Sequence, residues 1–321
     1  MSTYFQATDP DIWTGRSTAS VEDRLYWYQN ILCQKTKVLS MVPLEAASAV
    51  GLIGYACDEG VRRNQGRVGA RQGPDAIRRQ LAKLAWHHGA IRPIDYGNVL
   101  CPDEAMETCQ QQLGQLVAAL LQNKVFPIVL GGGHDVAYGH YLGLRKHLSA
   151  DTRLGIINFD AHFDLRPPVA GGNSGTPFHQ ILHEHPFQQC NYMVLGLQAA
   201  ANTQSLFEVA TAQAVGHVTA AHCQWWHLDA LRQQLTEFAE QQDALYISID
   251  LDGFASAYAP GVSAPSPVGM EPNLVMELLA TLFKSGKVIS CDLAEMNPTF
   301  DVDGSTARLA ARLVDHIVSL L

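Results

Sequence analysis

Two carboxylates and an imidazole lie within one short stretch of the sequence, as Asp160, His162 and Asp164. Two ionised carboxylates so close together repel each other unless a cation lies between them. Oxygen ligands together with one imidazole suit a hard or borderline divalent metal ion, of which Mn²⁺ is a natural choice. The alternative is a turn whose acidic side chains face water. Taken alone, the stretch leaves both interpretations open.

Further candidate ligands occur on either side of this stretch. His134 follows three consecutive glycines, which allow the backbone to approach a metal site closely. Asp250 and Asp252 form a second pair of neighbouring acids. A single ion takes about four to six donors and would leave several of these acids repelling one another. Two ions about 3.5–4 Å apart would use all of them and would make hydroxide available near neutral pH, which is hydrolase chemistry.

Each group of candidate ligands follows an apolar run that is typical of a buried strand in a parallel sheet. The runs are 125–130, 154–159 and 244–249. Open α/β sheets bind ligands outside the carboxyl ends of their strands. We therefore expect the candidate ligands to meet at one edge of the sheet.

Predicted strands and helices alternate along the chain, which indicates an α/β fold with a largely parallel sheet covered by helices. The 321 residues fit one large domain, with residues 1–42 as an N-terminal extension packed on it that includes a helix over 21–33. A linker is predicted around 93–102. The other predicted strands are 49–56, 192–197 and 288–293, and the predicted helices are 75–84, 103–121, one through 141–147, 178–185, 272–283 and 305–321.

The composition limits the classes of partner and location. A formal charge of −9 argues against nucleic acid or an anionic membrane surface as the main partner. Seven cysteines at irregular spacing, with no C-x-x-C, argue against a disulfide scaffold or a zinc ribbon. No signal peptide and no apolar stretch long enough to span a membrane is evident. We therefore expect a small-molecule substrate and a reducing cytoplasm.

Other polar residues carry weaker functional signals. Four arginines in the loop 58–74 could bind an anionic substrate or simply face solvent. His183 begins a His-Glu-His sequence that lacks the second histidine of an H-E-x-x-H zinc motif. Cys57, beside the arginine loop, is expected to be an inert buried thiol. Ordinary loop and helix positions are expected for His217, His222, Cys223 and His227.

The ligand motifs occur in an order that resembles a known family. Gly131–His134, Asp160–Asp164 and Ser248–Asp252 look like the three metal-binding motifs of the ureohydrolases, which include arginase, agmatinase and formiminoglutamase. The resemblance runs from about Gly51 to the C-terminus, and it implies a three-layer α/β/α fold with two Mn²⁺ ions per subunit. In the implied arrangement Asp160 and Asp250 bridge both ions, His134 and Asp164 complete one site, and His162 and Asp252 complete the other.

Within this family the sequence is most similar to the formiminoglutamase branch. The loop 58–70, Trp13–Arg16 and Ser174–Phe178 look like that branch, and the serine that begins the last segment stands where arginases carry a histidine. Arg166 suits a substrate with a second carboxylate, because a guanidinium binds carboxylates through two parallel hydrogen bonds. His179 departs from the pattern, since formiminoglutamases often have an arginine there. The candidate substrate-binding residues are Arg166, Ser174, Gly175, His179 and Gln198.

The resemblance implies hydrolysis of N-formimino-L-glutamate to L-glutamate and formamide, a step of histidine degradation. Glu295 matches the family glutamate that binds the cationic amidine-like group. Asp164 is expected to orient the hydroxide between the metals and to relay a proton to the leaving amine. The alternatives are a guanidino-acid hydrolase related to guanidinobutyrase or agmatinase, a metal-binding relative without turnover, and a nucleotide-binding module. The sequence is also compatible with a homo-oligomer.

Overall fold

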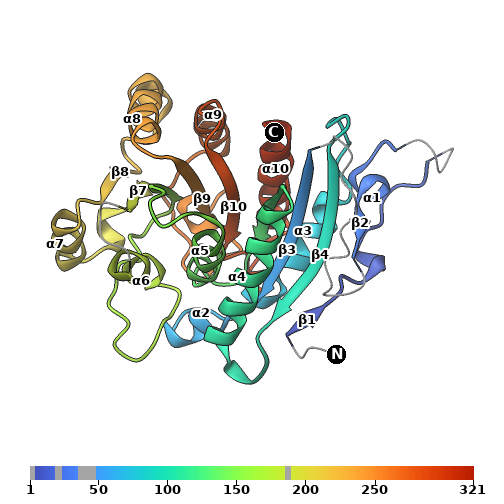
Figure 1. Ribbon diagram of the computed structural model, residues 1–321, viewed down its shortest axis with the longest axis horizontal. Helices are drawn as coiled ribbons and strands as arrows, with labels where there is room; N and C mark the ends of the chain where they lie inside the picture. Colours follow the sequence, from blue (N-terminus) through green and yellow to red (C-terminus); the bar gives the residue numbers. More distant parts are fainter. Residues whose placement is uncertain (1–3, 19–23, 35–47, 185–188) are drawn as a thin grey trace.

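The computed structural model describes residues 4–18, 24–34, 48–184 and 189–321, and within them ten strands form one sheet (Figure 1). The strand order is β1-β4-β3-β5-β10-β9-β6-β7-β8, with β2 also paired to β4. Only the short edge strand β1 pairs antiparallel, so the predicted mostly parallel sheet is confirmed. The strands are β1 Phe5–Gln6, β2 Leu32–Cys33, β3 Ala49–Ala56, β4 Arg92–Leu100, β5 Val125–Leu130, β6 Leu154–Phe159, β7 Cys190–Leu197, β8 Gly216–Thr219, β9 Ala244–Asp250 and β10 Val288–Ala294.

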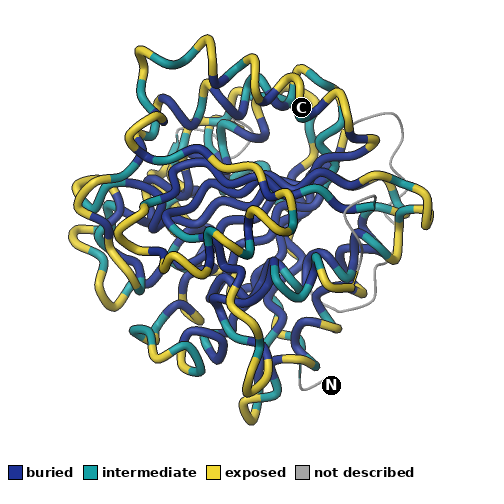
Figure 2. The backbone as a smooth tube through the Cα atoms, turned by 90° about the vertical axis from the view of Figure 1, so that its left-hand side faces the viewer, coloured by how far each residue is buried: buried dark blue, intermediate teal, exposed yellow. Residues whose placement is uncertain are grey.

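Helices cover both faces of the sheet, which forms the buried central layer of the molecule (Figure 2). They pack against it in two separate hydrophobic cores. One core packs α3, α8, α9 and α10 against the sheet, and the other packs α4, α5, α6 and α7 against the opposite face. This arrangement confirms the predicted three-layer α/β/α fold. The helices are α1 Trp27–Asn30, α2 Glu59–Arg63, α3 Gly73–Leu81, α4 Met106–Gln122, α5 Val136–His147, α6 Pro177–Glu184, α7 Gln204–Ala212, α8 Leu228–Glu240, α9 Pro272–Phe283 and α10 Ser305–Ser319.

The central strands show why the apolar runs of the sequence form a buried sheet. All six residues of β6 are buried, and two consecutive residues of this strand, Ile156 and Ile157, contribute to opposite cores. Successive side chains of a strand point to opposite faces, so a strand that is covered on both faces needs apolar residues at every position. The same rule explains Ile128 and Val129 of β5, which also belong to opposite cores.

The linker predicted around residues 93–102 is wrong, because most of this segment belongs to β4, which pairs in parallel with β3. The segment contains prolines and polar residues, which favour a loop in a sequence reading. Its polar side chains are nevertheless buried, and Asp95 forms an ion pair of 2.8 Å with the fully buried Arg78 of α3. A partner that is distant in the sequence therefore allows this polar strand to lie inside the sheet.

The helix predicted over residues 21–33 is also wrong in extent. Within the described residues the helix is limited to α1, and Leu32–Cys33 instead forms β2 beside β4. Residues 1–3, 19–23 and 35–42 of the predicted extension lie outside the described residues. Trp27 of α1 is fully buried, and its indole N–H donates to Asp315 of α10 at 2.7 Å. This tryptophan therefore attaches the N-terminal segment to the last helix.

The remaining differences are small shifts of element boundaries and elements that were not predicted, namely α2, α7, α8, β1 and β8. α4 begins at Met106 rather than at Asp103, whose positive φ of 52° interrupts the helix. β8 was not predicted, and it places His217 on an edge strand rather than in a loop or helix. No described helix is both long and apolar enough to cross a membrane.

Candidate metal centre

The predicted ligands converge at the carboxyl ends of four neighbouring strands. These strands are adjacent in the order β5-β10-β9-β6. His134 follows β5, Glu295 follows β10 and Asp160 follows β6, while Asp250 is the last residue of β9. The parallel arrangement brings residues that are more than a hundred positions apart in the sequence to the same edge. Gly132, one of the glycines before His134, packs directly on the backbone that follows β3, since a Cβ there would lie 1.8 Å from the carbonyl oxygen of Cys57.

A first group of ligand atoms surrounds Nδ1 of His134. This nitrogen lies 3.1 Å from Asp160 Oδ2, 2.9 Å from Asp164 Oδ2 and 3.0 Å from Asp250 Oδ2. The four side chains offer ligand atoms that all lie within 4.8 Å of one another. One imidazole nitrogen cannot donate to three carboxylates at once, so these atoms are arranged around a common point rather than paired with each other.

A second group adjoins the first and shares Asp160 with it. His162 Nδ1 lies 3.3 Å from Asp160 Oδ1 and 3.2 Å from Asp252 Oδ2, and these three residues also offer ligand atoms within 4.8 Å of one another. Asp250 and Asp252 reach the same centre because β9 ends in a 3-10 turn, Leu251–Gly253. A carboxylate shared by two groups is the geometry expected of a bridging ligand between two ions.

A buried hydrogen-bond chain determines which nitrogen of His134 faces the carboxylates. Ser248 Oγ donates to Asp292 Oδ1 at 2.6 Å and lies 2.9 Å from His134 Nε2. Because Ser248 has one proton and gives it to the carboxylate, it must accept from an N–H at Nε2 of His134. In the neutral imidazole, Nδ1 then carries a lone pair that points at three carboxylates, an arrangement of acceptors that is favourable only around a cation. Without a metal, burial would lower the pKa of His134, but the charge of Asp250 outweighs it and raises the pKa well above its usual range.

The sequence reasoning assigned no role to Ser248 or Asp292, although the signal was available. Both are polar residues inside predicted apolar strands, and both are fully buried. Asp292 also accepts a hydrogen bond from Tyr246 and lies 2.7 Å from Nδ1 of His140. A buried polar residue inside a strand requires partners, so its presence could have indicated a supporting network.

Backbone and amide donors fix the orientation of the shared acids. Asp160 Oδ1 accepts from the N–H of His162 at 2.7 Å, and Asp160 Oδ2 accepts from Asn158 Nδ2 at 2.9 Å. Asp250 Oδ1 accepts from the N–H of Asp252 at 2.8 Å. These bonds hold the carboxylates in place without neutralising their charge.

The electrostatics of the cluster show an excess of negative charge. Burial raises the pKa of Asp252 and of Glu295 well above the usual range, and the charge of Asp250 raises both further. The charge of Asp252 raises the pKa of His162 to about 12. A bound divalent cation would remove this repulsion, because it would be the largest local charge in the site.

Burial would likewise raise the pKa of the shared acid Asp160, but the neighbouring imidazoles of His134 and His162 outweigh it and lower the pKa. Asp164 has a raised pKa, first because of burial and then because of the charge of Asp160. The backbone of Asp164 and of Glu295 also adopts positive φ angles, of 49° and 67°, which residues other than glycine rarely adopt. Backbone strain of this kind concentrates at functional sites.

A cavity of about 280 Å³ opens onto the cluster. Glu295 lines it with an unusual pair of oxygens: Oε1 accepts from the N–H of His134 at 2.9 Å, whereas Oε2 is buried without a partner. Arg166 also lines the cavity, and its exposed guanidinium donates to Asn64 Oδ1 at 2.7 Å. The lining residues are Asn64, Gln65, Gly66, Arg67, His134, His162, Asp164, Arg166, Ser174, Asp250, Asp252, Ser263, Ala264 and Glu295.

The structure separates the predicted substrate-binding residues into two sets. Arg166 and Ser174 line the cavity, and Gly175 is adjacent, since a Cβ there would lie 3.4 Å from Arg166 Nη1. His179 and Gln198 are not among the lining residues. His179 Nδ1 lies 3.2 Å from the carbonyl oxygen of Leu165, and the Gln198 amide donates to Ser266 and to the carbonyl of Val268.

The arginines of the loop 58–74 lie in different surroundings. Arg62 and Arg63 both pair with Glu59, and Arg63 pairs with Glu107 as well, so their charges are neutralised by acids. Arg67 instead lines the cavity, where its guanidinium donates to the carbonyl of Ser263 at 2.9 Å. Asn64 is therefore a cavity residue that the sequence did not indicate, whereas Arg67 is one of the four arginines considered for an anionic substrate.

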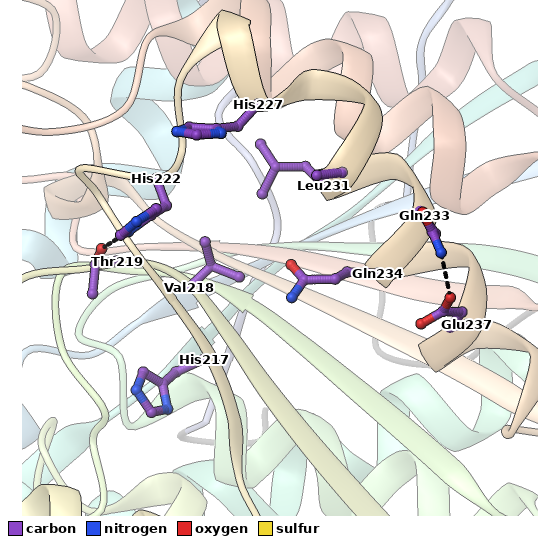
Figure 3. A pocket seen from close by; sticks show the side chains of 10 residues that line it. His217, Val218, Thr219, His222, His227, Leu231, Gln233, Gln234 and Glu237 are labelled. Carbon is purple, nitrogen blue, oxygen red and sulfur yellow. Dashed lines mark hydrogen bonds between the residues drawn. The ribbon is translucent and has the colours of Figure 1, made fainter.

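A second cavity, of about 490 Å³, lies between β8 and α8 (Figure 3). His217, His222 and His227 extend into it from three different positions, and His222 Nδ1 lies 2.8 Å from Thr219 Oγ1. Within the described part of the chain these histidines do not form a group of three converging ligand atoms. The cavity therefore lacks the geometry that distinguishes the acidic cluster.

The model of the arginase family matches residues 48–319 of the sequence. The chain belongs to the arginase family. It is 44% identical over 312 residues to a formimidoylglutamase of Geobacillus kaustophilus, covering 96% of this chain and 94% of the relative. It is also 44% identical over 318 residues to a formimidoylglutamase of Aeromonas hydrophila, covering 98% of this chain and 99% of that relative.

Solved structures of the arginase family share the fold. A formiminoglutamase of Trypanosoma cruzi with Mn²⁺ superposes with a TM-score of 0.75 at 26% identity, covering 85% of this chain and 93% of the other. A formimidoylglutamase of Bacillus subtilis superposes with a TM-score of 0.78 at 24% identity, covering 86% and 88% of the two chains. The resemblance inferred from the three motifs is confirmed at the level of the family and the fold.

Proposed function

We propose that this arginase-family chain is a formimidoylglutamase, which hydrolyses N-formimino-L-glutamate to L-glutamate and formamide in histidine degradation. Relatives that carry this name align with nearly its whole length. The observation that carries the proposal is one cavity that combines an unpartnered buried carboxylate oxygen, on Glu295, with an exposed guanidinium, on Arg166. The substrate has the complementary charges, a cationic formimino group at one end and carboxylates at the other.

We further propose that the acidic cluster holds two Mn²⁺ ions. His134, Asp160, Asp164 and Asp250 would hold one, and Asp160, Asp250, His162 and Asp252 the other. The donor set fits, because it consists of carboxylates and imidazoles, and because His134 Nδ1 and Asp252 Oδ1 are buried without hydrogen-bond partners. Ions bound in this way supply Lewis acidity and lower the pKa of water to near neutral.

The residues of the chain then have distinct roles in the hydrolysis. Glu295 accepts hydrogen bonds from the formimino N–H groups and holds their positive charge beside the cluster. Addition of water to the formimino carbon is followed by cleavage of the bond from that carbon to the glutamate nitrogen. The departing amine needs a proton, which in the proposed reaction Asp164 relays from its position beside the substrate cavity. Arg166 binds a substrate carboxylate through its guanidinium.

The test is release of formamide from formiminoglutamate by Mn²⁺-loaded protein, with guanidinobutyrate, arginine and agmatine in parallel. We expect selective turnover of formiminoglutamate. Selective turnover of guanidinobutyrate would keep the roles of the metals and Glu295 but would replace the proposed substrate with a guanidino acid. Absence of turnover of all four, with manganese bound, would instead support the relative without turnover.

The role of Arg166 has its own test. A hydrogen-bonded pair with a charged group contributes about 1.5–3 kcal/mol, so Arg166→Gln should raise the KM for formiminoglutamate by roughly 10- to 100-fold. Arg153→Gln is the matched control, because Arg153 is also exposed but pairs with Asp243 away from the cavity. An equal effect of both substitutions would contradict the assignment. A cytoplasmic location and a homo-oligomeric state stay predictions.

A further inference from the structure

Three cysteine side chains gather in a place that the proposed reaction does not use. Cys57 directly follows β3, Cys101 directly follows β4, and Cys109 lies in the first turns of α4. All three are buried, with exposed fractions of 1%, 8% and 0%, and none forms a disulfide. Their sulfur atoms lie within 4.8 Å of one another, so three separate elements bring three thiols to one point.

We propose that Cys57, Cys101 and Cys109 form a second metal site, which binds one soft, thiophilic ion such as Zn²⁺ or Cu⁺. Thiolates are soft ligands and select these ions, whereas the carboxylates and imidazoles of the acidic cluster suit Mn²⁺. The two sites therefore differ in chemistry as well as in position. Three thiolates suffice for a trigonal ion, and a tetrahedral Zn²⁺ would take one further ligand.

The environment of the three thiols favours ionisation of one of them. Hydrogen bonds from Cys109, and then from Cys57, lower the pKa of Cys101 to about 4. Burial, and then hydrogen bonding to Cys101, raises the pKa of Cys109 far above its usual range. The cluster therefore supports one thiolate with the other two thiols as donors. Full ionisation of all three requires a cation, and metal binding provides it by displacing the protons.

A cavity gives an ion access to the cysteines. It has a volume of about 280 Å³ and is lined by Cys57 and Cys101 together with the acidic side chains Asp58, Glu59, Asp103 and Glu104. Two arginines, Arg62 and Arg71, also line it, and Arg62 is paired with Glu59 and Glu104. A cavity of this size also admits water, which can supply the fourth ligand of Zn²⁺.

The test titrates metal into the fully reduced, full-length protein with excess Mn²⁺ present to occupy the acidic cluster. Cd²⁺, as a spectroscopic substitute for Zn²⁺, and Cu⁺ are added in separate experiments. Ultraviolet absorption from sulfur-to-metal charge transfer reports only ions that are bound to thiolate. We expect this absorption to saturate at one ion per chain with at least one of the two metals. Absence of the absorption with both would overturn the proposal.

Variants identify the ligands. Cys101→Ser and Cys109→Ser should abolish the absorption, whereas Cys223→Ser, which changes a buried cysteine outside the group, should retain it. Unchanged absorption in Cys101→Ser would contradict the proposal, and the wild-type titration decides even if the variants do not fold. Asp160→Asn should retain the sulfur signal, so failure of this site and failure of the manganese site are distinguishable.

Discussion

The ion pair of Arg78 in α3 with Asp95 in β4 and the acidic cluster are both buried groups of charge, but only the ion pair is neutralised by its own members. Arg78 is fully buried, and its guanidinium donates to Asp95 Oδ1 at 2.8 Å and to Asn98 Oδ1 at 2.5 Å. The second oxygen of Asp95 accepts from the indole N–H of Trp13 at 2.7 Å. Apart from Arg78 Nε, the polar atoms of this ion pair have partners.

The acidic cluster has the opposite balance. Five carboxylates face two imidazoles there, and three buried atoms are left without partners: His134 Nδ1, Asp252 Oδ1 and Glu295 Oε2. Uncompensated buried charge costs several kcal/mol per ion, so a fold retains it only where something else binds. The comparison indicates that paired buried charge stabilises the sheet, whereas unpaired buried charge is available for a ligand.

The largest expected effect comes from removing a shared acid of the unpaired cluster. Lewis acidity contributes several kcal/mol and each 1.4 kcal/mol is tenfold in rate, so Asp160→Asn and Asp250→Asn should each reduce turnover by roughly 1,000-fold or more. Because the metal-free cluster has excess negative charge, the fold should persist. Turnover assays and circular dichroism check this. Unfolding of both variants in the absence of metal would contradict the distinction between the acidic cluster and the ion pair of Arg78 and Asp95.

The ion pair of Arg78 and Asp95 should respond in the opposite way, because its loss should lower stability and leave turnover unchanged. Asp95→Asn leaves the fully buried Arg78 with the partly exposed Asp75, 3.3 Å away, as its remaining acidic partner, and should lower the free energy of unfolding by up to about 3 kcal/mol. Turnover per folded molecule should be unchanged. Denaturant unfolding together with kcat measures both quantities. Asp243→Asn, which breaks an exposed pair with Arg153, is the control and should change stability little. A loss of turnover larger than the loss of stability in Asp95→Asn would contradict a purely structural role.

A smaller effect should follow from disturbing the support of a ligand rather than the ligand itself. Ser248→Ala removes the acceptor that orients His134, and loss of such a partner typically weakens metal binding by about 10- to 100-fold. Equilibrium titration with Mn²⁺ measures it. Ser290→Ala is the matched control, because Ser290 is equally buried and lies 2.6 Å from His140, which is not a proposed ligand. Equal affinities in the two variants would remove Ser248 from the site.

The smallest effect is expected at Asp315, whose carboxylate binds Trp27 and so attaches the N-terminal segment to α10. Asp315 Oδ1 lies 2.7 Å from His88 Nε2 and accepts from Trp27 at 2.7 Å. Burial alone would raise the pKa of Asp315, but these bonds, first that of His88, lower it overall. A lowered pKa contributes stability above the unfolded-state value of about 3.9, and this stability is lost as the pH falls through the folded-state value.

Asp315→Asn should therefore lower the melting temperature near pH 7, and the difference from the wild type should shrink as the pH falls below about 4. Thermal unfolding of both proteins across this range measures it. A difference that is constant with pH, or that grows on acidification, would show that the Asp315 carboxylate is not stabilised by its partners.

The sequence predicted the acidic cluster more completely than it predicted the rest of the site. Asp160 and Asp250 were found because each ends an unmistakably apolar run, and the rule that parallel strands end at one edge places such residues together. β4 was misread because its polar residues are compensated by Arg78, a partner that no local pattern reveals. These strands were therefore predictable where the buried side chains are apolar, and not where buried polar side chains pair with a partner that is distant in the sequence.

Cavity residues were predictable only where the motif itself reaches the site. Arg166 lies two residues beyond Asp164 and lines the cavity, whereas Gln198 is held by Ser266 and Val268. Asn64 and Arg67 enter the cavity from a loop whose path depends on contacts with Ser263. Loop paths of this kind are set by tertiary contacts, which spacing along the chain does not encode.

Manganese stoichiometry tests the central claim most directly. Metal-free wild-type protein and its Asp160→Asn variant are titrated with Mn²⁺, and the bound ions per chain are counted by elemental analysis after gel filtration. We predict two ions per wild-type chain and fewer than one in the variant, because Asp160 belongs to both ligand groups. One ion or none in the wild type, or two ions retained in Asp160→Asn, would contradict the assignment of the acidic cluster as a dinuclear centre.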